Sequence, residues 1–141
     1  MYYPVDPTSR KDALVGGTIS CNASGFIPGD KGATRHWVNR LKILLTNGYI
    51  TDITRGDYIT NDAKFILICD DKKIVVEVPS YHRPKIKNAS GPFTAEEDKL
   101  DFIDLIIGSE GVFALIIDAE FNLADSPKDF LDLFITLPSE N

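Results

Sequence analysis

Cysteine and histidine are scarce in this sequence, and their scarcity excludes several classes of protein. Among 141 residues there are two cysteines, Cys21 and Cys69, and two histidines. Two cysteines are too few for a disulfide scaffold, and they would need help from the histidines to build a structural zinc site. Cys69 lies in the apolar run 65–69, where we expect a buried thiol that packs as a small hydrophobe. We therefore predict no metal site and no cofactor.

Long apolar runs are missing as well. No stretch approaches the roughly 20 apolar residues that a membrane-spanning helix needs. Residues 1–12, MYYPVDPTSRKD, lack the apolar core of a secretory signal. The composition, 43% hydrophobic and 26% charged, is that of an ordinary globular domain. We expect a cytoplasmic protein, in the host cytoplasm if the source is viral, with no membrane partner.

Basic residues are nearly absent from the last third of the chain. Residues 1–94 carry 13 Lys and Arg against 9 Asp and Glu, whereas residues 95–141 carry 2 against 12. The charge balances are therefore +4 and −10. An acidic segment of this kind can attract a basic partner surface. The alternative is that its acids only form the solvent-exposed faces of amphipathic helices.

Hydrophobic periodicity predicts an α+β fold, in a single compact domain over residues 1–141. We expect a mixed or antiparallel sheet of about six strands with about three helices. The expected strands are 13–20, 49–54, 58–60, 64–70, 73–78 and 112–117, and the expected helices are 34–47, 94–107 and 126–137. The apolar hairpin 64–78 should be central in the sheet. A capping box at 94–97 and Gly108 should bound the second helix.

The stretch 25–37, GFIPGDKGATRHW, is the first candidate binding site. A helix N-terminus presents free N–H groups and a partial positive charge, and here Lys31, Arg35 and His36 would flank it. Such a site suits a phosphate or a carboxylate. The spacing differs from a P-loop, because the last glycine is not followed by Lys and Ser or Thr. A glycine-rich helix entry without a ligand is the alternative.

A second basic cluster, YHRPKIK at 81–87, lies in the proline-containing segment 79–93, which we expect to be an irregular loop or arm. Aromatic and basic residues together, here with His82 and Arg83, form surfaces that stack on bases and neutralise phosphates. The clusters 31–42 and 82–87 together indicate an alternative function, the binding of a nucleotide or another anionic small ligand.

Residues 112–121 are similar to the first metal-binding motif of DnaQ-like exonucleases, in which an Asp-x-Glu pair leaves a buried strand toward catalytic cations. The resemblance implies further acidic ligands much later in the chain, so we interpret Asp118 and Glu120 as marking the end of a strand. No other pattern supplies a catalytic group, and we expect the protein not to be an enzyme.

The uneven charge favours a small acidic binding protein without catalytic activity, of the kind that phages and mobile elements use to inhibit host enzymes. The acids expected on the outer side of the second helix, Asp98, Asp101 and Asp104, are the candidate contacts to a protein partner with a basic surface. A homo-oligomer is a further arrangement that the sequence leaves open.

Overall fold

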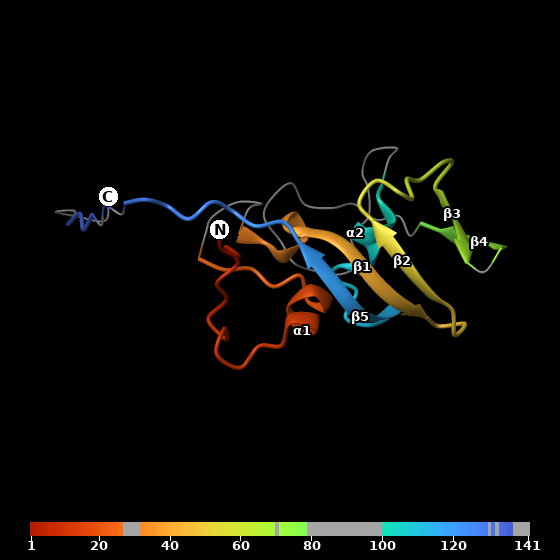
Figure 1. The fold of residues 1–141 in the computed structure, drawn as a ribbon, viewed down its shortest axis with the longest axis horizontal. Coiled ribbons are helices and arrows are strands. Elements are labelled where there is room, and N and C mark those ends of the chain that lie inside the picture. The colour runs from red at the N-terminus through yellow and green to blue at the C-terminus, as the bar shows by residue number, and fades with distance from the viewer. Residues whose placement is uncertain (27–31, 70, 79–99, 130, 132, 137–141) are drawn as a thin grey trace.

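The computed structural model describes residues 1–26, 32–69, 71–78, 100–129, 131 and 133–136, and its fold is α+β (Figure 1). The elements in this part are α1 (Val15–Ser20), the 3₁₀ turn η2 (Thr34–His36), β1 (Val38–Leu45), β2 (Ile50–Thr54), β3 (Lys64–Cys69), β4 (Lys72–Glu77), α2 (Phe102–Ile106) and β5 (Ala114–Phe121). The predicted α+β class is confirmed, but the counts differ: the described residues contain five strands and two short α-helices, where about six strands and about three helices were predicted.

The strands form two separate antiparallel sheets. One has the order β2-β1-β5, and the other is the hairpin β3-β4. Side chains alternate along a strand, so each sheet sends one set of residues inward. On β1 the inward residues Leu41 and Ile43 are fully buried, and on β3 Phe65, Leu67 and Cys69 are buried. The burial of Cys69 was predicted.

The core joins both sheets to α2. Phe102 of α2 meets the ring of Phe65 edge to face at a centroid distance of 5.1 Å. The residues just before α2 pair with residues 58–60. The backbone N–H of Thr60 donates to the carbonyl of Leu100, and the N–H of Leu100 donates to the Thr60 hydroxyl. The buried hydrophobic residues of the core are Ile19, Val38, Leu41, Ile43, Ile53, Phe65, Leu67, Cys69, Leu100, Phe102, Ile103, Leu105, Ile106, Ile107 and Ala114.

The helix predicted over 34–47 is wrong. Only η2 is helical there, and β1 follows it as the central strand of its sheet. A β-bulge lies between Val38 and Arg40 on β1, so that Val38 and Leu41 both point inward although they are three residues apart. A spacing of three imitates the period of a helix, because the bulge shifts the alternation by one residue.

Two further predicted elements are wrong. The strand predicted over 13–20 is instead the helix α1, whose single buried residue is Ile19. The helix predicted over 126–137 is not present in the described residues of that range, which run away from the body of the molecule (Figure 1). The apolar residues Leu131, Phe134 and Ile135 in this range are exposed.

The second predicted helix is correct at its end and wrong at its start. Gly108, with φ +83°, follows the helix, as predicted. The helix begins only at Phe102, after the N-cap residue Asp101, and the predicted capping box at 94–97 lies outside the described residues.

The predicted hairpin and the strand at 49–54 are confirmed as β3-β4 and β2. The hairpin is not central in a sheet, because β3 and β4 pair only with each other. Its outer face is exposed: Ile68 and Val75 are each 53% exposed. The expected arm at 79–93 lies outside the described residues.

Candidate functional site

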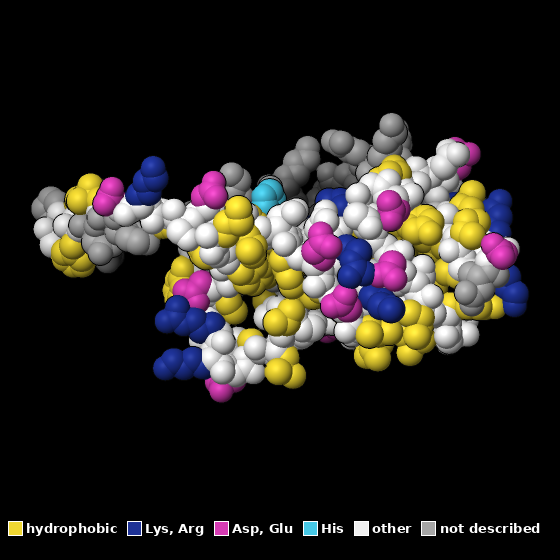
Figure 2. Space-filling model, in the orientation of Figure 1, with side chains coloured by type: hydrophobic (Ala, Val, Ile, Leu, Met, Phe, Trp, Pro, Cys, Tyr) yellow, Lys and Arg dark blue, Asp and Glu magenta, His cyan; other side chains and the backbone are white. Residues whose placement is uncertain are grey.

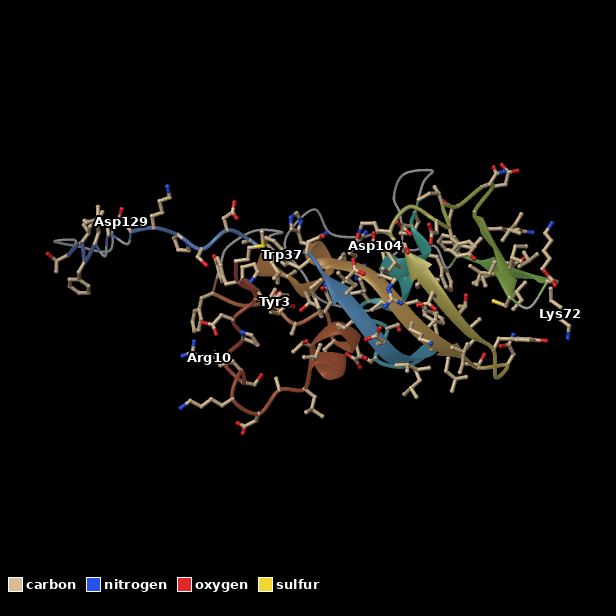
Figure 3. All side chains as sticks on the ribbon, in the orientation of Figure 1. Tyr3, Arg10, Trp37, Lys72, Asp104 and Asp129 are labelled. Carbon is tan, nitrogen blue, oxygen red and sulfur yellow. The ribbon has the colours of Figure 1, made fainter. Side chains whose placement is uncertain are left out.

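Half of the predicted binding residues lie in the described part of the chain. Lys31, His82, Arg83 and Asp98 fall outside it. The structure describes Arg35, His36, Asp101 and Asp104, and it brings three of them to one corner of the fold, where η2, the end of β2 and α2 meet. Figure 3 labels Asp104 at this corner.

Arg35, predicted to bind an anion, and Asp104, predicted to bind a partner, bind each other. Arg35 Nη1 lies 3.2 Å from Asp104 Oδ1, and each side chain is only 15% exposed. The same guanidinium donates to the backbone carbonyls of Asp104 and Ile107, near the end of α2. Asn22, buried in a left-handed turn after α1, accepts a hydrogen bond from the backbone N–H of Arg35. Arg35 therefore connects η2 to the end of α2 inside the molecule.

Arg55 also belongs to this corner, although no sequence pattern identified it as a candidate binding residue. It lies in the turn after β2 and donates from Nη1 to Asp104 Oδ2 at 2.9 Å. Its Nε donates to the carbonyl of Val38 and its Nη2 to the carbonyl of Arg35. Asp104 is therefore shared between two arginines. Because each nitrogen of Arg55 uses one N–H in these bonds, each terminal nitrogen keeps a second N–H.

Asp101 joins the turn after β2 to the start of α2. Its Oδ2 accepts from the backbone N–H of Gly56 at 2.6 Å, and its Oδ1 accepts from the backbone N–H of Ile103. Burial raises the pKa of Asp101 above its usual value of 3.8, and the charge of Asp104 acts in the same direction. The two backbone bonds and Arg55 act against this rise. We call Arg35, Arg55, Asp101 and Asp104 the corner cluster.

The raised pKa of Asp101 predicts a specific pH dependence. A carboxyl with a higher pKa in the folded state than in the unfolded state stabilises the fold below the unfolded value, and this contribution is lost as the pH rises through the folded value. We expect Asp101→Asn to remove this loss. The free energy of unfolding of wild type minus that of the variant should fall as the pH rises above 3.8. Urea unfolding of both proteins across this range measures the difference, and a rise would contradict the prediction.

His36 stands beside the corner cluster without taking part in its hydrogen bonds. It is exposed, and its ring meets that of Trp37 edge to face at 5.1 Å. Nothing in the described residues tests whether His36 binds an anion. The roles predicted for Lys31, Arg35, His36, His82 and Arg83 in anion binding therefore stay predictions, as do those of the three acids in partner binding.

A second charged group lies on the outer face of the β2-β1-β5 sheet. Arg40 of β1 forms ion pairs with Asp52 of β2 and, at 2.8 Å, with Asp118 of β5. Glu120 lies 3.7 Å from Arg40 Nε and accepts a hydrogen bond from Asn39. We call Arg40, Asp52, Asp118 and Glu120 the sheet-face cluster. Asp118 and Glu120 lie within β5, so the prediction that they mark a strand end is wrong.

Neither charged group has the composition of a metal centre. The described residues contain no group of three or more His, Cys, Asp and Glu side chains that could hold an ion. In the same part of the chain no helix is long and apolar enough to cross a membrane.

Comparison with known proteins gives two relatives and no family model. D-2-hydroxyglutarate dehydrogenase of Stutzerimonas stutzeri (strain A1501) is 25% identical over 138 residues, which cover 98% of this chain and 22% of that protein. Glycolate oxidase subunit GlcD of Bacillus subtilis (strain 168) is 27% identical over 128 residues, which cover 91% of this chain and 20% of that protein. The chain thus spans about a fifth of the length of these curated relatives. No solved structure matches.

These relatives contradict the function predicted from the sequence. One is a dehydrogenase and the other a subunit of an oxidase, and the similarity runs through nearly the whole chain. The prediction of a non-enzymatic inhibitor of the phage or mobile-element kind is therefore wrong, and the same relatives contradict the expectation that the protein is not an enzyme. Composition could not reveal this similarity, because proteins of unrelated function can have the same charge balance.

Proposed function

We propose that this chain is a domain of an oxidoreductase that acts on small 2-hydroxy acids. The observation that carries the proposal is the alignment of nearly the whole chain with two proteins named for D-2-hydroxyglutarate and glycolate. Both of these compounds have a hydroxyl on the carbon next to a carboxylate. Their oxidation to a 2-oxo acid removes a hydride equivalent from that carbon and a proton from the hydroxyl, and an electron acceptor takes up two electrons.

Within this function the chain's contribution is substrate binding, through Arg55. A guanidinium presents parallel N–H groups that match a carboxylate, and such charge-assisted pairs are the stronger hydrogen bonds in proteins. Arg55 is 34% exposed, whereas Arg35 is 15% exposed, so Arg55 is the arginine of the corner cluster that a substrate reaches. Each of its terminal nitrogens retains one N–H for that contact.

The charges around Arg55 are compatible with an anion. Asp104 supplies one negative charge for two arginines. Asp101 is the other carboxyl of the corner cluster, and burial raises its pKa. Three protein groups already fix the guanidinium of Arg55, which lowers the entropy lost when a carboxylate binds.

Thermal unfolding with added glycolate or D-2-hydroxyglutarate tests the proposal. A ligand at about 100 times its dissociation constant adds roughly 2.7 kcal/mol to the free energy of unfolding, which raises Tm by several degrees. Acetate and glutarate, which lack the 2-hydroxyl, should give smaller shifts. Arg55→Gln should abolish the shift, and Arg10→Gln, which removes the same charge from an exposed pair with Asp6, should retain it.

The outcomes separate the two parts of the proposal. A chain that none of the 2-hydroxy acids stabilises would contradict the proposed function. A shift that persists in Arg55→Gln would leave the function standing and remove Arg55 as the carboxylate contact. Arg55→Lys keeps the charge and loses the paired N–H geometry, so an intermediate shift is expected for it.

A further inference from the structure

The outer face of the β2-β1-β5 sheet is ordered in rows that run across its strands. The register places Leu44 beside Ile50 of β2 and Leu115 of β5, and it places Lys42 beside Asp52 and Asp118. One end of the face is thus apolar and the rest is charged. Figure 2 shows this face in the middle of the molecule, with interleaved acidic and basic side chains beside a hydrophobic area.

The apolar row is exposed to an extent that a solvated sheet face does not need. Leu115 is 63% exposed and Ile50 is 53% exposed. An antiparallel sheet with one face in water presents polar residues on that face. Contiguous apolar side chains with a charged border are the usual arrangement of a protein interface.

The charges differ between neighbouring strands on this face. The outward residues of β1 include Arg40 and Lys42, and those of β5 include Asp118 and Glu120. The carboxylates remain accessible, with Asp118 56% and Glu120 57% exposed. Within the described residues Lys42 takes no part in the ion pairs of this face, which all go to Arg40. A basic strand with an unused cation therefore lies beside an acidic strand.

We propose that this face binds the same face of a second copy of the chain. A two-fold axis parallel to the strands, between β1 and β5, lays β1 of one copy over β5 of the other. The strand register then places Lys42 over Asp118, Arg40 over Glu120 and Leu44 over Leu115, each contact occurring twice. Such self-complementarity is what a two-fold interface requires.

The distances suit this arrangement. Sheets that pack face to face lie about 10 Å apart, a gap that an extended lysine and an aspartate cross together. The leucines of both copies would bury one another at the apolar end. This interface is independent of the proposed function, since it involves neither Arg55 nor the corner cluster.

Sedimentation velocity of the full chain over a series of concentrations tests the proposal. The wild type should form a dimer, and Leu115→Lys should convert it to a monomer. Val75→Lys is the matched control, because Val75 is 53% exposed on the outer face of the other sheet. It should leave the dimer intact. Circular dichroism checks that every variant is folded.

A charge exchange makes the test specific to the proposed pairing. Lys42→Glu alone places two carboxylates against each other, and Asp118→Lys alone places two ammonium groups against each other. Each should raise the dimer dissociation constant at least about tenfold, and the double variant should restore much of it. A wild-type chain that is monomeric at every concentration overturns the proposal. A dimer that Leu115→Lys leaves unchanged overturns this interface.

Discussion

Replacing Arg35 by methionine should lower the free energy of unfolding by about 3 kcal/mol. The side chain is 15% exposed and holds three acceptors at once: the carboxylate of Asp104 and the backbone carbonyls of Asp104 and Ile107. Methionine fills a similar volume but donates no hydrogen bond. Those carbonyls then lose a donor near the end of α2, and Asp104 keeps only Arg55. Urea unfolding followed by circular dichroism measures the loss.

Two comparisons make this result interpretable. Arg10→Met removes an arginine from an exposed pair with Asp6, where the loss should stay below about 1 kcal/mol. Asp104→Leu added to Arg35→Met removes the stranded carboxylate as well, and the double variant should lose less than the sum of the single changes. A loss in Arg35→Met no larger than that in Arg10→Met would show that the corner cluster does not stabilise the fold.

Part of the uneven charge of the sequence is paired within the chain. The acidic last third and the more basic first part bind each other within the chain. Four ion pairs cross between them: Arg35 and Arg55 with Asp104, and Arg40 with Asp118 and Glu120. Three of the twelve acids in residues 95–141 are therefore paired within the chain. Sequence alone could not reveal this, because the partners are far apart in the chain.

The elements that depend on short-range sequence patterns were predicted correctly, and those that depend on distant contacts were not. The hairpin β3-β4 and the end of α2 at Gly108 follow from short-range patterns and were correct. β1 was taken for a helix because Trp37, Leu41, Leu44 and Leu45 have helical spacing, but of these four residues only Leu41 is buried. The last carbonyls of α1 accept hydrogen bonds from residues far away in the chain: the N–H of Gly108 donates to the carbonyl of Ile19, and the N–H of Glu110 donates to that of Ser20. Such contacts cannot be predicted from the local sequence, which contains two glycines.

The candidate site was predictable only in part, for the same reason. Arg35 and Asp104 were both identified as important charges, yet their pairing spans 69 residues. Arg55 lies in the turn after β2, where Gly56 has φ +95°. No local pattern indicates that the side chain of Arg55 would reach α2. The similarity to a dehydrogenase and to an oxidase subunit runs through most of the chain and has no local motif as its signal.

Truncating Phe65 to alanine should have a still larger effect, a loss of about 3–5 kcal/mol. Phe65 is fully buried and is the residue of β3 whose ring contacts Phe102 of α2. A hairpin of two strands is marginal by itself, so β3 and β4 depend on their inner face for stability. The cavity left by the ring should weaken the attachment of the whole hairpin to the core.

Hydrogen exchange distinguishes this local effect from general destabilisation. In Phe65→Ala the amides of β3 and β4 should exchange faster, while those of β1, the central strand of the other sheet, keep more of their protection. Ile66→Ala is the matched control on the same strand, since Ile66 points outward and is 45% exposed. It should cost far less. Equal acceleration in β1 and the hairpin would contradict separate attachment and would make the two sheets one cooperative unit, joined through Phe102.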